Sequence, residues 1–155
     1  MHSILHDDIH IVMCSYKRVC NLSEIIESLI NQSIFHKIHL HILNNNPIET
    51  TNINNIIEKY NSKIPIDKTL FNNKTIKITL KNYNNENNVF ERFIYGKELR
   101  TLGINYIIYI DDDMLYIPTW VEQMYNMRKP KHFITWYVKL FLHDNKFIDY
   151  NNKTN

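Results

Sequence analysis

The chain has 155 residues, of which 44% are hydrophobic and 12% aromatic, and its formal net charge is +2. This length and composition predict one folded domain over residues 1–155, and the interspersed acids and bases lack the basic stripe of nucleic-acid-binding proteins. No apolar run reaches the roughly 20 residues of a membrane-spanning helix, and the N-terminus does not follow a signal-peptide pattern. We therefore expect a cytoplasmic protein with no transmembrane segment and no nucleic-acid partner.

The first part of the chain is predicted to form a strand, a helix and a second strand. Residues 9–16 are apolar along most of their length, as a central parallel strand should be, and residues 37–43 are predicted as a second strand. Between them a helix is predicted to begin at Asn21, with Glu24 three residues later as its capping-box-like partner. The order predicts a βαβ unit. His39 and His41 share one strand face, a spacing that can ligate a metal, but packing or surface positions are the expected roles.

The rest of the chain continues the alternation of helices and strands. Its predicted elements are a short helix over 53–60, a loop over 61–74, a strand over 75–80, a helix over 89–102 stopped by Gly103, a strand over 106–110, a helix starting near Pro118 and a strand over 132–141. The helix over 89–102 is expected to turn Val89, Phe90, Phe93 and Ile94 inward, and 145–155 to be a polar, frayed tail. The predicted fold is a single Rossmann-like α/β domain with a mostly parallel sheet flanked by helices.

Three consecutive carboxylates, Asp111, Asp112 and Asp113, directly follow the apolar strand over 106–110. In open parallel sheets, ligands bind beyond the carboxyl ends of the strands, which is where these acids fall. Three adjacent like charges repel one another, so a fold that gathers them usually offsets them with a cation or with water. The alternative is a solvated acidic turn that caps the next helix.

In this order the segments resemble the family-2-like glycosyltransferases of the GT-A fold, from about residue 9 to residue 124. Four places carry the resemblance: the first turn with Ser15, Tyr16 and Arg18, the helix end at Gln32, the second strand end at 43–46, and Ile110 to Asp113 as an Asp-x-Asp motif. Asn44 departs from the Asp that the family commonly has there. That departure leaves the identity of the nucleotide base open.

The resemblance implies transfer of a sugar from a nucleotide-diphosphate sugar, expected to be UDP-linked, to an unknown acceptor that is a glycan, a protein or a lipid-linked molecule. Mn²⁺ or Mg²⁺ is the implied cofactor, because hard oxygen ligands favour these ions over zinc. Such a cation bridges protein carboxylates and the diphosphate and stabilises the leaving group. Asp113 is the expected metal ligand, and Asp111 is expected to assist the metal or to reach the ribose.

The expected nucleotide-binding residues lie at strand ends and on the helix over 89–102. They are Ser15, Tyr16, Arg18, Asn44, Arg92, Lys97, Asp111 and Asp112. The ring of Tyr16 offers a stacking face for a base, and the carboxamide of Asn44 can both donate and accept hydrogen bonds. The three cationic side chains are candidates for balancing the diphosphate, with simple solvation as the alternative.

The catalytic base is not assigned by these patterns. After Glu122 the only acids are Asp144 and Asp149, which are the remaining candidates. Three other functions therefore stay open: a nucleotide-sugar-binding module without catalysis, the donor-binding half of a longer enzyme, and a phosphatase with Asp111 as the nucleophile.

Overall fold

The computed structural model describes most of the chain, in the ranges 8–33, 37–63, 76–83, 89–129, 139–141 and 147–149. The chain divides into two compact units, residues 1–122 and 123–155. The first unit carries the main sheet and three of the helices discussed below, and each unit is described by itself. Within the described ranges, no helix combines the length and apolar character needed to cross a bilayer.

Four parallel strands form the sheet of the first unit, in the order β3-β2-β1-β4. The predicted α/β class with a parallel, Rossmann-like sheet is therefore confirmed. All four strands lie where the apolar runs predict them, and β3 extends two residues further than expected. Their bounds are β1 (Ile9–Ser15), β2 (Ile38–Asn44), β3 (Ile76–Asn82) and β4 (Ile107–Ile110).

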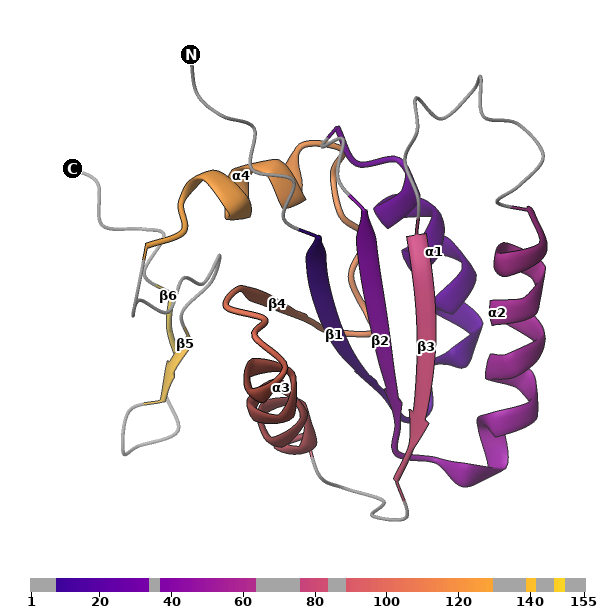
Figure 1. The fold of residues 1–155 in the computed structure, drawn as a ribbon. Coiled ribbons are helices and arrows are strands. Elements are labelled where there is room, and N and C mark those ends of the chain that lie inside the picture. The colour runs from indigo at the N-terminus through magenta and orange to yellow at the C-terminus, as the bar shows by residue number, and fades with distance from the viewer. Residues whose placement is uncertain are drawn as a thin grey trace. The chain divides into compact units, whose positions relative to one another are not determined.

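Helices cover both faces of this sheet, with α1 and α2 along one face and α3 on the other (Figure 1). Connections between parallel strands are right-handed, so the direction in which the next strand is added decides which face the connecting helix covers. From β1 to β3 the strands are added in one direction, whereas the connection through α3 runs back past β2 and β1 to place β4 on the other side of β1. Gly103 follows α3 with a left-handed φ of 87°, as predicted for its stop. The helix bounds are α1 (Leu22–Ile30), α2 (Thr50–Lys63) and α3 (Glu91–Thr101), preceded by the short 3₁₀ turns η1 (Val19–Asn21) and η2 (Pro47–Glu49).

The end of the chain forms a separate small sheet. Helix α4 (Trp120–Asn126) crosses the division between the units, and β5 (Lys139–Phe141) pairs antiparallel with β6 (Phe147–Asp149) in the second unit. Of the strand predicted over 132–141, only the last three residues lie within the described part. Strand β6 falls inside the predicted polar tail, whose other residues lie outside the described part.

The core lies on both faces of β1 and β2. A cluster of Val12, Cys14, Leu43 and Leu99 joins these strands to α3, and Tyr60 of α2 donates a 3.1 Å hydrogen bond to the carbonyl of Ser23 on α1. Successive strand residues point to opposite faces, so a strand covered by helices on both sides is mostly apolar. This explains why both strands are mostly apolar, with histidines at positions 10, 39 and 41.

The prediction of which residues of α3 face the sheet is wrong. Val89, Phe90, Phe93 and Ile94 are 55%, 66%, 47% and 51% exposed, whereas the buried residues of α3 are Gly96 and Leu99. The prediction assumed that the large apolar side chains face the sheet, but the helix approaches the sheet most closely at Gly96, its smallest residue. That close approach is possible because Gly96 has no Cβ.

Gly96 faces the side chain of Tyr109 on β4, and a Cβ added to this glycine would overlap the tyrosine hydroxyl oxygen. We expect Gly96→Ala to lower the free energy of unfolding by about 1–2 kcal/mol, because the overpacking outweighs the helix-propensity gain of alanine. Tyr109→Phe removes the oxygen and leaves the ring carbon 3.0 Å from the added Cβ, so the cost should shrink in that background. Urea denaturation of the four proteins of this double-mutant cycle measures the difference, and a stabilising Gly96→Ala beside Tyr109 would contradict it.

Candidate functional site

The candidate site lies where β1 and β4 end side by side. Met13 of β1 pairs with Ile110 of β4, so Ser15 and Asp111 follow at the same edge of the sheet. The connection out of β1 runs through α1 on one face of the sheet, whereas the connection into β4 runs through α3 on the other, so the strand order reverses between β1 and β4 and this edge is a topological switch point. Ligands of open α/β sheets bind at such points, so the fold brings the predicted acids to the expected place.

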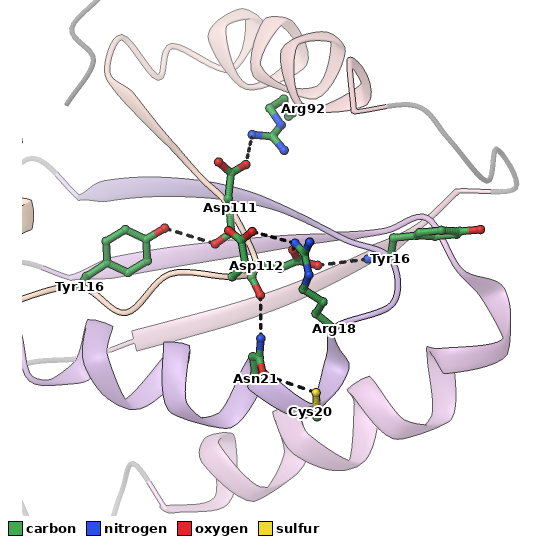
Figure 2. Close-up of polar contacts among 9 residues, drawn as sticks. Tyr16, Arg18, Cys20, Asn21, Arg92, Asp111, Asp112 and Tyr116 are labelled. Carbon is green, nitrogen blue, oxygen red and sulfur yellow. Dashed lines mark hydrogen bonds and ion pairs between the residues drawn. The ribbon is translucent and has the colours of Figure 1, made fainter. Parts of the chain in front are cut away.

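The middle acid, Asp112, points back into the first unit. Its carboxylate accepts hydrogen bonds from the Tyr16 amide at 3.4 Å and from Arg18 at 3.1 Å, and its carbonyl accepts one from the side chain of Asn21 at 3.4 Å (Figure 2). Its side chain is 13% exposed. Asp112 therefore fastens the end of β4 to the turn after β1.

The outer two acids are open to solvent and each pairs with an arginine. Arg18 donates to Asp113 at 2.9 Å while it also holds Asp112, and Arg92 of α3 donates to Asp111 at 2.8 Å. The side chains of Asp111 and Asp113 are 58% and 46% exposed. Two guanidinium groups thus offset three carboxylates, and the half-exposed Arg18 remains accessible to a ligand.

An aromatic residue, Tyr116, holds the start of the loop after β4 through a hydrogen bond. The hydroxyl of Tyr116 donates to the carbonyl of Asp111 at 3.2 Å, and burial raises the pKa of this hydroxyl, so it stays protonated. Tyr116 is a site residue that the sequence did not reveal, because an aromatic residue beside an acidic turn has no distinctive spacing.

Helix α1 begins directly after Asn21, as predicted, but the predicted capping-box-like role of the Asn21 side chain is wrong. The backbone of Asn21 is helical and its side chain makes no capping bond, since the carboxamide instead donates to the Asp112 carbonyl. A 3₁₀ turn, η1, precedes α1 and takes the place of the cap. Asn21 therefore belongs to the candidate site, and only the contact between segments 91 residues apart reveals it.

Asn44 ends β2 and is fully buried. Its carboxamide donates to Asn82 at 2.9 Å and to Thr50 at 3.2 Å, and it accepts from the amide of Asn46 at 2.9 Å. Both polar groups of the side chain are thus used to join the ends of β2 and β3 to α2. A contact between Asn44 and a nucleotide base stays a prediction, and in this structure the side chain is engaged within the protein.

The remaining predicted residues lie in different places. Ser15 is buried at the end of β1, and Tyr16 is half-buried with Lys17 Nζ 5.0 Å from the centre of its ring. Lys97 lines a separate pocket on α3. Asp149 belongs to β6 of the second unit, and Asp144 lies outside the described residues.

The donor chemistry of the site bears on whether it can hold a metal ion. Carboxylate oxygens suit Mn²⁺ and Mg²⁺, and Asp111 and Asp113 are exposed enough to offer them. However, each is engaged by an arginine, and among the described residues no group of three or more His, Cys, Asp or Glu side chains is arranged to hold a metal ion. As the side chains lie, the site does not fit a metal held by the protein alone.

Solved structures of S. aureus TarS, a glycosyltransferase, share this fold. TarS 1-349 gives a TM-score of 0.54 at 12% identity, and the match covers 77% of this chain and 32% of that chain. The complex of TarS 1-349 with UDP gives the same TM-score, identity and coverage of this chain, and the match covers 31% of that chain. A further TarS structure gives 0.51 at 11% identity over 77% of this chain and 19% of that chain. The chain thus spans about a third or less of these proteins.

No protein-family model and no curated protein matches the chain. At the low identity of the TarS structures the likeness shows a glycosyltransferase-like fold, and it does not distinguish the predicted family-2 group from other glycosyltransferases. The predicted α/β architecture and the fold of a known glycosyltransferase therefore agree.

Proposed function

We propose that this chain binds a nucleotide-diphosphate sugar, with UDP as the nucleotide, and transfers the sugar to an acceptor hydroxyl. The observation that carries the proposal is the position of the two arginine-bound acids, Asp111 and Asp113, at the switch point of a sheet that shares its fold with TarS. TarS has been solved in complex with UDP, which supports the choice of nucleotide.

The chemistry of transfer explains why cations are needed at this edge. The acceptor oxygen forms a bond to the anomeric carbon, the bond from that carbon to the diphosphate breaks, and the diphosphate leaves with the electron pair. Arg18 and Arg92 lie beside the acids and would offset the charge that develops on the diphosphate. The group that takes the acceptor proton is not assigned, so Asp144 and Asp149 stay candidates, and a binding module without catalysis remains the alternative.

The role of Mn²⁺ or Mg²⁺ in donor binding is to be determined by experiment. Asp111 and Asp113 are the residues that would offer oxygen ligands, with the donor's diphosphate supplying further ones. The cation, when bound, would neutralise charge on the leaving diphosphate. Their arginine pairs would have to rearrange for this to happen.

The direct test is binding of UDP, UMP and uridine, measured by thermal shift and calorimetry with Mn²⁺, with Mg²⁺ and with EDTA. We expect UDP to raise the melting temperature more than uridine does. UDP release from UDP-sugars, assayed in parallel, separates a transferase from a binding module. Failure of every nucleotide to bind under all three conditions would refute the proposed function.

Arg18→Ala should weaken UDP binding by about 10- to 100-fold, since one charge-assisted hydrogen bond contributes about 1.5–3 kcal/mol. Uridine, which lacks the diphosphate, should bind the variant and the parent protein equally. Lys59→Ala removes an exposed cation from α2 and serves as the matched control, with no expected change. An equal loss of uridine and UDP affinity would instead assign Arg18 a role in holding the turn through Asp112.

A further inference from the structure

A hollow lies on the opposite side of the first unit's sheet from α1 and α2, between α3 and the edge strand β4. Its volume is about 460 Å³. None of the acids of the candidate site lines it. Its lining residues are Phe93, Gly96, Lys97, Arg100, Thr101 and Tyr109.

The floor of this pocket is aromatic. The rings of Phe93 and Tyr109 lie 5.1 Å apart between centroids with a tilt of 55°. Gly96 lets the Tyr109 hydroxyl reach the helix backbone, and no hydrogen bond from that hydroxyl is found among the described residues. Phe93 is 47% exposed, so an apolar ring face is presented to a ligand.

The rim of this pocket is positively charged. Lys97 and Arg100 are exposed and three residues apart, so they share one side of α3. Neither forms an ion pair with any described residue, and Glu98, the acid between them, is paired with Lys81 at 2.6 Å. The two cations are therefore available for an anion, and the nearest acid on the helix is already engaged.

We propose that this pocket binds an anionic sugar, specifically a sugar phosphate, as a site separate from the UDP site. The aromatic floor suits the apolar face of a sugar ring, and the hydroxyl of Tyr109 can hydrogen-bond to sugar hydroxyls. Lys97 and Arg100 suit the phosphate, Arg through its planar fork and Lys as a point charge. A nucleic acid does not fit, because a single pair of cations makes no extended basic stripe.

The proposal does not depend on the proposed transferase function, because it uses none of the residues at the ends of β1 and β4. In this proposal Lys97 contacts a second ligand and not, as was predicted from the sequence, the diphosphate of the donor.

Titration of ¹⁵N-labelled protein with glucose 6-phosphate, glucose and inorganic phosphate tests the pocket. We expect saturable shifts of the amide resonances of residues 93–101 and 109 with glucose 6-phosphate, and at least tenfold weaker binding of glucose and of phosphate. Lys97→Ala/Arg100→Ala should weaken glucose 6-phosphate binding at least tenfold. Lys59→Ala/Lys77→Ala removes two exposed cations elsewhere in the unit and should leave that binding unchanged.

Several results would overturn the proposal. They are the absence of saturable shifts, equally tight binding of phosphate alone, and an equal loss in the control double variant, which would indicate general charge attraction. Competition by UDP at the same resonances would also overturn it, because the pocket would then belong to the donor site. UDP binding to the unaltered protein is read separately, so failure of the transferase proposal and failure of the pocket are distinguishable.

Discussion

Replacing Gln32 with leucine is expected to lower the free energy of unfolding by about 3 kcal/mol. The Gln32 side chain is 1% exposed and follows α1. Its amide donates to the carbonyls of Ser28 and Ile117, both at 2.9 Å, and its oxygen accepts from the amide of Val121 at 2.8 Å. Leucine has a similar size but would leave the buried Val121 amide without this acceptor and would remove both bonds to the carbonyls, although the Ile117 carbonyl keeps the Trp120 amide as a donor at 2.9 Å.

Chemical denaturation of Gln32→Leu and of the parent protein measures this cost. Asn55→Leu makes the same amide-to-leucine change at an exposed position of α2, and we expect less than about 0.5 kcal/mol there. Because the loop after β4 is attached to α1 through Gln32, the variant should also bind UDP more weakly than the control does. A stability equal to that of the parent would show that the loop holds its position by other contacts.

Acidification from pH 7 to pH 4.5 is expected to remove roughly 2 kcal/mol of stability through His41. This histidine is 6% exposed, and His10 Nδ1 lies 3.0 Å from its Nε2 while the Thr79 and Tyr95 hydroxyls lie 3.0 and 3.1 Å from its Nδ1. Burial, followed by repulsion from the other histidines of the cluster and from Lys77, lowers its pKa to about 4. The packing predicted for the histidines of β2 is thus a hydrogen-bonded and stacked cluster.

The sign follows from the proton uptake of the two states. An unfolded chain takes up a proton on His41 near pH 6.5, whereas the folded chain resists it until about pH 4, so unfolding binds a proton in this window. The stabilisation is complete above about pH 6.5 and is lost as the pH falls toward 4. Denaturation of the parent and of His41→Gln at pH 7, 6, 5 and 4.5 checks this. A pH slope that is the same in both proteins would contradict the assignment to His41.

Much of the fold could be predicted because its signals are local. The mostly apolar segments over 9–16, 37–43 and 106–110 became β1, β2 and β4, since a strand buried on both faces needs apolar residues at most positions. The helix of 53–60 is longer than expected, beginning at Thr50, because polar asparagines on its exposed side hide the helical period. The inward face of α3 was misread because a glycine makes the closest contact.

The sequence by itself determined the strands, the α/β alternation and the position of three acids directly after β4. Only the tertiary structure decided what each acid does: Asp112 turns inward to Tyr16 and Arg18, while Asp111 and Asp113 remain at the surface. The physical reason is distance along the chain, because Arg18 and Asp112 are 94 residues apart and meet only after β4 pairs with β1. Local patterns specify a strand and its end, whereas its neighbour in the sheet depends on how the whole domain packs.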